Sequence, residues 1–142
     1  MPSWLPDWSA VPATLAGFWA EYHLCTLSTL DRYGAPHAVP VGAMLDVEQE
    51  CAWIITRGTS QKIRNLRTDP RLTVTQVDRA RWASLVGTGE VREDAASIER
   101  ACELYAARYR PPSASPTRVA VRITVARVRG SAQVLPGAAT AP

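Results

Sequence analysis

Short runs in which apolar and polar residues alternate recur along the chain, and they predict strands of a sheet with one buried face. The run VAVRITVARV at 119–128 shows the pattern most plainly, since valine and isoleucine alternate there with arginine and threonine. Six strands are predicted in all, over residues 23–30, 37–45, 51–56, 71–77, 81–92 and 119–128. Strands this short, with bends and turns between them, indicate a mainly β fold, a small antiparallel barrel that is closed or split.

The strand predicted at 37–45 contains residues that disturb regular pairing. Pro40 has no amide hydrogen to donate, so it belongs at an edge or a bulge of a sheet. Gly42, two residues later, indicates a bend or a close approach of the backbone to another part of the fold. The segment from His37 to Val41 is therefore expected to be free to line a site.

Helical spacing of apolar residues predicts two substantial helices and one short helix. The first begins at Pro12, and its apolar side is expected to cover an open end of the sheet or a partner surface. The second covers 95–109, with Asp94 as its N-cap. The short helix crosses between the strands at 51–56 and 71–77.

These elements predict one folded domain flanked by a short segment at each end, as suits a chain of 142 residues. Residues 1–11 are rich in proline and tryptophan and are expected to be irregular. The barrel domain covers 12–131. The tail at 132–142 is rich in alanine and proline and is expected to be mobile.

The net charge of +3 and the pI near 9.0 make the chain mildly basic, which suits a phosphorylated or carboxylated ligand. The arginines are dispersed, so nucleic-acid binding is not expected. Three cysteines without a C-x-x-C pair indicate reduced thiols, and no signal peptide is recognised, so the cytoplasm is the expected location. No apolar run approaches the length that spans a membrane.

The segment from Thr56 to Pro70 is a candidate anion site. Ser60 is well placed to cap the short helix, and a helix start offers backbone amides and a positive dipole end to a phosphate. Lys62 is the only lysine in the chain; the other cationic side chains at neutral pH are arginines. The same residues also suit a solvated helix start, and the pattern alone leaves both interpretations open.

Two further segments are candidate ligand sites, and no metal-site motif is found in the sequence. The turn from Gln76 to Trp82 gathers an amide, a carboxylate, arginines and a tryptophan, although it also suits an ordinary hairpin with Trp82 in the core. His37, in the segment that is free to line a site, is a candidate site residue or a plain surface strand residue. No metal site is expected, because His23 and His37 have no cysteine or carboxylate at ligand spacing. The motifs of P-loop and α/β-hydrolase enzymes are also missing.

At this point the sequence resembles a known family. The stretches SQKIRNL at 60–66 and DPRLTV at 69–74 are similar to the signature of the pyridoxamine-phosphate-oxidase-like split-barrel superfamily. The stretches QVD at 76–78 and ARW at 80–82, and RYR at 108–110 before a proline-rich loop, resemble the deazaflavin-dependent reductases within it. The similarity runs from about His23 to Ser131.

The resemblance implies a six-stranded antiparallel split β-barrel that forms a homodimer, with a cofactor site at each side of the interface. It implies a coenzyme F420-dependent oxidoreductase that passes a hydride to a conjugated small molecule, in particular a tetrapyrrole such as biliverdin. The cofactor contacts that it implies are His37, Ala38, Val39, Pro40, Val41, Thr56, Arg57, Ser60, Gln61, Lys62, Val77, Asp78, Ala80, Arg81, Trp82 and Ser131.

Within that set, Thr56, Ser60, Gln61 and Lys62 are expected to hold the cofactor's phosphate, and His37 to Val41 to back its ring. Arginines near the loop from Arg110 to Pro116 are expected to meet substrate carboxylates. No residue is an obvious proton donor, so the proton is expected to come from solvent or substrate. The alternatives are an FMN-binding relative and a non-catalytic module that holds the cofactor or a tetrapyrrole.

Overall fold

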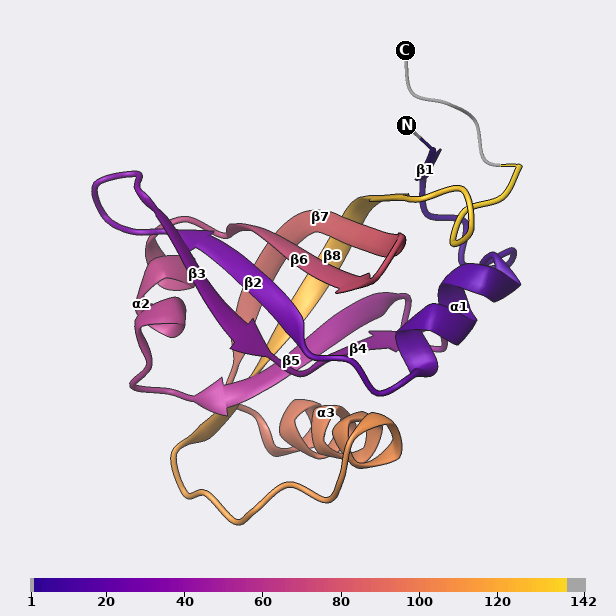
Figure 1. Ribbon diagram of the computed structural model, residues 1–142. Coiled ribbons are helices and arrows are strands. Elements are labelled where there is room, and N and C mark those ends of the chain that lie inside the picture. Colours follow the sequence, from indigo (N-terminus) through magenta and orange to yellow (C-terminus); the bar gives the residue numbers. More distant parts are fainter. Residues whose placement is uncertain (1, 138–142) are drawn as a thin grey trace.

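The computed structural model describes residues 2–137, and every predicted strand is present in it (Figure 1). The strands are β1 (Ser3–Trp4), β2 (Cys25–Leu30), β3 (Pro36–Val41), β4 (Ala43–Asp46), β5 (Cys51–Arg57), β6 (Arg71–Asp78), β7 (Arg81–Arg92) and β8 (Arg118–Gly130). The helices are α1 (Ala13–Ala20), α2 (Gln61–Thr68) and α3 (Ala95–Arg108).

The long strands form one curled antiparallel sheet in the order β3-β2-β6-β7-β8-β5-β4, and β1 pairs with β8. Only Gly42 separates β3 from β4, so one bent strand joins the two ends of this path and the sheet curls into a split barrel. With β3 and β4 counted as that one strand, the prediction of six main strands in a mainly β split barrel is confirmed. β3 is an edge strand, as Pro40 requires.

The bend at Gly42 lies against α3. A Cβ atom at this position would be 2.8 Å from Tyr105 Cε2 and 2.9 Å from Tyr109 Cε2, closer than such atoms approach. A second irregularity of the sheet lies at Gly87, because the β7–β8 register shifts between Val86 and Gly87. A Cβ atom at Gly87 would lie 2.1 Å from the carbonyl oxygen of Thr124.

Most of the core fills the barrel and is closed at one end by α1, whose Leu15, Phe18 and Trp19 are buried in it. This confirms the expectation that the first helix covers an open end of the sheet. A smaller core lies between the sheet and α3 and includes Trp53 and Ala101. Asp94 is the N-cap of α3, as predicted, and its side chain accepts a hydrogen bond from the backbone amide of Ser97.

Both ends of the described chain are more ordered than their composition indicates. The segment expected to be irregular contains β1, where Ser3 pairs with Arg129. In the segment expected to be a mobile tail, Val134 and Leu135 are each 1% exposed and belong to the barrel core. The rest of that prediction, from residue 138 onward, lies outside the described residues. No helix within residues 2–137 is long and apolar enough to cross a membrane.

Candidate functional site

An uncovered outer face of the sheet carries four of the side chains that the sequence singled out. Opposed residues in an antiparallel pair point to the same side, and residues two apart along a strand do the same. The register pairs Pro40 with Thr26, Thr26 with Thr75 and Val77 with Trp82. The side chains that share this outer face are therefore Ala38, Pro40, Val77 and Trp82.

The outer face is open to solvent in the single chain. No helix lies across β2, β3 and β6 in the view of Figure 1. Val77, where this face reaches the β6–β7 hairpin, is 63% exposed, which is unusual for a valine in a sheet. An exposed apolar face of this kind suits a planar ring or a partner surface.

The remaining residues of β3 point inward. Val41 is buried and Val39 packs against the barrel core, so these two residues offer only their backbone to the outer face. His37 is half-buried and lines a cavity of about 570 Å³ together with Gln61. The Nδ1 atom of His37 is buried and has no hydrogen-bond partner within the described residues. The fold thus brings His37 to the start of α2, as a shared site requires.

The start of α2 is a concentration of positive charge. Burial and the neighbouring charge of Arg57 both lower the pKa of Lys62 below its ordinary value. Neither cation forms an ion pair with a carboxylate within residues 2–137. Two like charges held together without a counter-ion are stabilised by a bound anion.

Hydroxyl groups next to these cations remain available to a ligand. Ser60 occupies the N-cap position as predicted, but its side chain does not cap the helix. Instead its Oγ atom accepts a long hydrogen bond of 3.4 Å from Thr56 Oγ1. Gln61 is engaged elsewhere, because its Nε2 atom donates to Asn65 Oδ1 at 2.7 Å. The sites that suit a phosphate are therefore the amide end of α2, the hydroxyls and the two cations.

The β6–β7 hairpin places Ser131 beside Trp82. The amide of Trp82 donates to Ser131 Oγ at 3.2 Å, and the amide of Ser131 donates to the carbonyl oxygen of Trp82 at 3.0 Å. Ala80 is exposed at the turn. The contact continues the β7–β8 register, in which Ala83 pairs with Gly130.

Asp78 and Arg81 are already paired within the chain. Arg81 donates to both carboxylate oxygens of Glu21 at 2.8 Å and also to Asp78. These contacts, together with a hydrogen bond from His23, lower the pKa of Glu21 to about 2. The two predicted contact residues therefore serve first to hold the hairpin against the end of α1.

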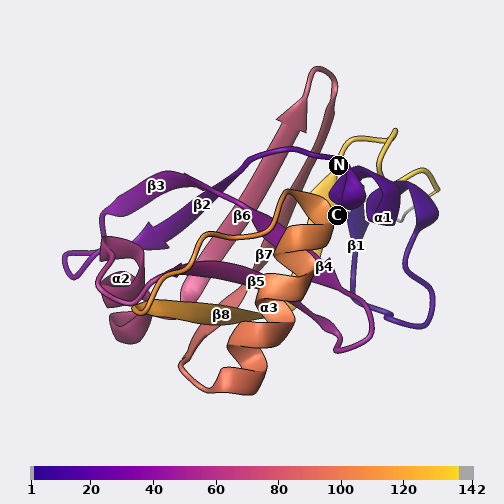
Figure 2. The same ribbon diagram turned by 90° about the horizontal axis from the view of Figure 1, so that it is seen from below.

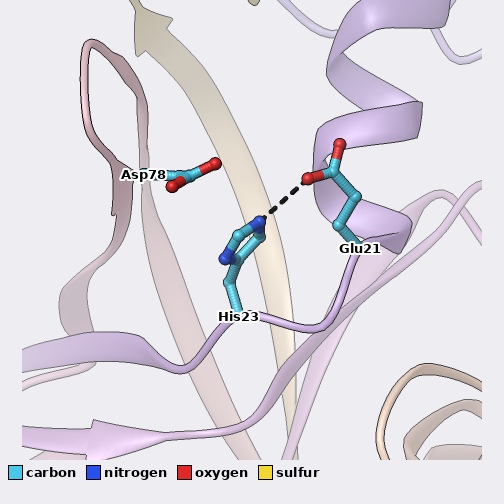
Figure 3. A group of neighbouring side chains, drawn as sticks. All are labelled: Glu21, His23 and Asp78. Carbon is cyan, nitrogen blue, oxygen red and sulfur yellow. Dashed lines mark hydrogen bonds and ion pairs between the residues drawn. The ribbon is translucent and has the colours of Figure 1, made fainter.

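His23 does not stand alone, which corrects the expectation from its spacing. Its Nε2 atom lies 3.0 Å from Glu21 Oε1, and Figure 3 shows both beside Asp78. The ligand atoms of these three residues lie within 4.8 Å of one another, a spacing that would suit a cation. Arg81 pairs with both carboxylates, so their negative charge is partly offset within the chain itself.

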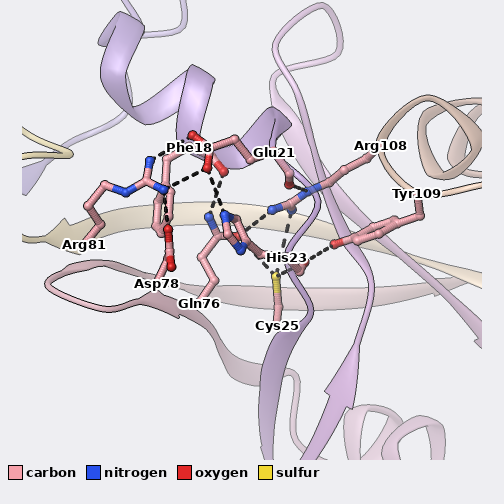
Figure 4. Close-up of polar contacts among 9 residues, drawn as sticks. All are labelled: Phe18, Glu21, His23, Cys25, Gln76, Asp78, Arg81, Arg108 and Tyr109. Carbon is pink, nitrogen blue, oxygen red and sulfur yellow. Dashed lines mark hydrogen bonds and ion pairs between the residues drawn. The ribbon is translucent and has the colours of Figure 1, made fainter.

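Gln76 is a structural residue, although its turn was a candidate site. It is 1% exposed, and its Nε2 atom donates to the carbonyl oxygen of Phe18. Its Oε1 atom accepts a hydrogen bond of 2.6 Å from Arg108 (Figure 4).

Arg108 is nearly buried and is fully engaged with oxygen atoms. Besides Gln76 it donates to the carbonyl oxygens of Ala43, at 2.6 Å, and Glu21, at 2.9 Å. Next to it, the hydroxyl of Tyr109 donates to the carbonyl oxygen of His23 at 2.8 Å. Arg108 and Tyr109 thus fasten the end of α3 to the barrel, and only Arg110 of this predicted motif is exposed.

The two groups of predicted contacts lie at opposite ends of the β2–β3 pair. α2 packs beside the end where Leu30 pairs with Pro36, and the β6–β7 hairpin extends past the end where Cys25 pairs with Val41. Figures 1 and 2 show α2 and the hairpin well apart in both views. The outer face of the sheet runs between them.

This fold defines the class of protein. The sequence matches the pyridoxamine 5'-phosphate oxidase family over residues 11–132, and the chain belongs to that family. A solved structure of a conserved hypothetical protein from Mycobacterium tuberculosis is 27% identical, with a TM-score of 0.75 over 94% of this chain and 91% of that chain. A structure described as an F420 reductase is 18% identical, with a TM-score of 0.68 over 84% of this chain and 98% of that chain, and supports the fold.

A curated relative is more similar in sequence. The F420H(2)-dependent biliverdin reductase of Mycobacterium tuberculosis (strain CDC 1551 / Oshkosh) is 41% identical over 118 residues. The match covers 83% of this chain and 86% of the relative.

Proposed function

We propose that this protein is a coenzyme F420-dependent oxidoreductase that reduces a conjugated acceptor of the biliverdin type. The observation that carries the proposal is the half-buried Lys62 beside Arg57 at the start of α2, two cations without a carboxylate partner among residues 2–137. The 41% identical relative is named for this cofactor and this substrate. The pairing of an anion site with an open apolar face suits a ligand with a phosphate and a planar ring.

The residues present fit such a cofactor. Its phosphate would be held by Lys62, Arg57 and the hydroxyls of Thr56 and Ser60, and His37 and Gln61 border the same end of the sheet. Its ring would rest on the outer face. The predicted contacts on that face are Ala38, Pro40, Val77 and Trp82, joined by the backbone of Val39 and Val41 and by Ala80 and Ser131 at its far end. Asp78 and Arg81 shape that end through their ion pair.

When bound, a reduced deazaflavin supplies a hydride. The contribution of the chain is to orient the ring through the phosphate and to keep water from one of its faces. The polar groups next to Val77 on the outer face are hydroxyls, such as the hydrogen-bonded pair Thr75 and Ser84, whose oxygens are 2.9 Å apart. A hydroxyl is a weak acid, so we assign the proton of the reduction to solvent or to the substrate.

We also infer a homodimer in the cytoplasm. The phosphate end and the β6–β7 hairpin are separated in one chain, and a second copy packed on the outer face would bring its own hairpin toward the α2 end. The exposed Val77 and Leu24 give that face the apolar surface that such an interface needs. The three cysteines are free, in keeping with a reducing compartment.

Side-by-side fluorescence titrations of the purified protein with coenzyme F420 and with FMN test the cofactor assignment. We expect saturable binding of F420 and markedly weaker binding of FMN. A protein that is yellow as purified and prefers FMN would instead be a flavoprotein of the same family.

A further inference from the structure

A second basic site lies beside the first, under the loop that follows α3. A cavity of about 730 Å³ opens between the end of β5, the bend at Gly42 and the loop formed by residues 110–115. Thr56 and Arg57 border this cavity and also belong to the proposed phosphate site. The two sites are therefore continuous.

The charged side chains that line this cavity are all positive. Arg57, Arg110 and Arg118 line it, and within the described part of the chain no aspartate or glutamate does. Arg57 and Arg118 are opposed residues of β5 and β8, so the strand register holds them side by side. None of the three forms an ion pair with a residue between 2 and 137. By contrast, Arg71 is neutralised by Asp69 at 2.7 Å.

The wall between these arginines is apolar and rigid. Ile55 and Tyr105 form part of it, and Pro111 and Pro112 stiffen the loop on the other side. The side chain of Arg118 donates to the carbonyl oxygen of Ser113 and tethers that loop, which leaves its other N–H groups free for a ligand. A preformed wall loses little conformational entropy when a ligand binds.

The geometry points to a binding site for the carboxylates of the reduced substrate, a conjugated molecule with an apolar body and at least two acid side chains. Guanidinium groups pair with carboxylates through two parallel hydrogen bonds, and the apolar wall matches the body of such a molecule. An oligoglutamate chain, such as the tail of the cofactor, would pair with the arginines but would make no apolar contact with the wall. This inference rests on the proposed function, because the substrate and the cofactor are taken from it.

The test compares biliverdin with its dimethyl ester, which has the same body without the charges. Binding is followed by quenching of tryptophan fluorescence in the absence of deazaflavin, for the wild type, Arg110→Gln and the control Arg71→Gln. Arg71 is exposed and far from the cavity in the sheet, so it reports the effect of losing one surface charge. We expect Arg110→Gln to weaken biliverdin binding about tenfold, the loss typical of one charge-assisted pair. It should leave binding of the ester unchanged.

Equal biliverdin affinity in Arg110→Gln and Arg71→Gln would overturn the inference, as would a wild type that binds the ester as tightly as the diacid. A parallel titration uses deazaflavin with and without its glutamate tail. If Arg110→Gln weakens only the tailed cofactor, the carboxylates belong to the cofactor and the substrate assignment is wrong. A wild type that binds no deazaflavin would refute the proposed function instead, and the biliverdin titrations distinguish the two failures.

Discussion

Replacing Lys62 by methionine is expected to affect ligand binding and protein stability in different ways. The change keeps most of the length of the side chain and removes its charge. A charge-assisted hydrogen bond to a phosphate contributes about 1.5–3 kcal/mol, so the affinity for F420 should fall roughly tenfold to a hundredfold. The free protein loses only a cation that is half-buried and repelled by Arg57. Its free energy of unfolding should therefore rise or stay within about 0.5 kcal/mol of the wild type.

Fluorescence titration and urea unfolding of the same samples measure the two effects. The control Lys62→Arg keeps the charge and should retain most of the affinity. The pKa of Lys62 is lowered, so the affinity of the wild type should decline as pH rises through that pKa, whereas Lys62→Arg should hold its affinity to higher pH. Lys62→Met with wild-type affinity, or with a large loss of stability, would refute the role of Lys62 in the phosphate site.

Two further predictions concern the fold around the site. Gly42→Ala should destabilise the protein by about 1–3 kcal/mol, because the new methyl group meets Tyr105 2.8 Å away. The control Gly17→Ala, in α1 with nothing within 4 Å, should stabilise it by about 0.5–1 kcal/mol; equal effects in thermal unfolding would argue against the close approach. Glu21→Gln should lower stability at neutral pH. Because the pKa of Glu21 falls from 4.5 to about 2 on folding, the stability that its charge provides is present above pH 4.5 and lost toward pH 2. The difference between Glu21→Gln and the wild type should shrink over that range, and a constant difference would contradict the role of the Arg81 pair.

The parts of the fold that depend on local pattern could be predicted from the sequence. Alternation identified the long strands, and Pro40 with Gly42 identified the bend that joins the two ends of the sheet. β1 has only two residues, too few for any alternation to be visible. Val134 and Leu135 lie in an alanine- and proline-rich segment, and their burial depends on the distant α1, where Thr14 donates to the carbonyl oxygen of Val134 at 2.6 Å.

The candidate site also has parts that the sequence predicts and parts that it does not. The cation pair at α2 follows from a strand, a turn and a short helix that are adjacent in the chain. The outer face needs the register of four strands, which pattern alone does not provide. Gln76 and Arg108 look like surface residues in the sequence, and only the carbonyl groups of other segments explain their burial. Arg118 was not singled out, because its partner in the cavity, Arg57, lies 61 positions earlier in the chain.

The most direct test of the central claim is to mix the purified protein with reduced coenzyme F420 and biliverdin under anaerobic conditions. The absorbance of biliverdin and the oxidation of the deazaflavin are followed together. We predict that biliverdin is lost in proportion to the deazaflavin oxidised, at a rate set by the protein concentration and lowered in Lys62→Met at limiting cofactor. Biliverdin that stays intact beside saturating reduced deazaflavin would contradict the proposed function.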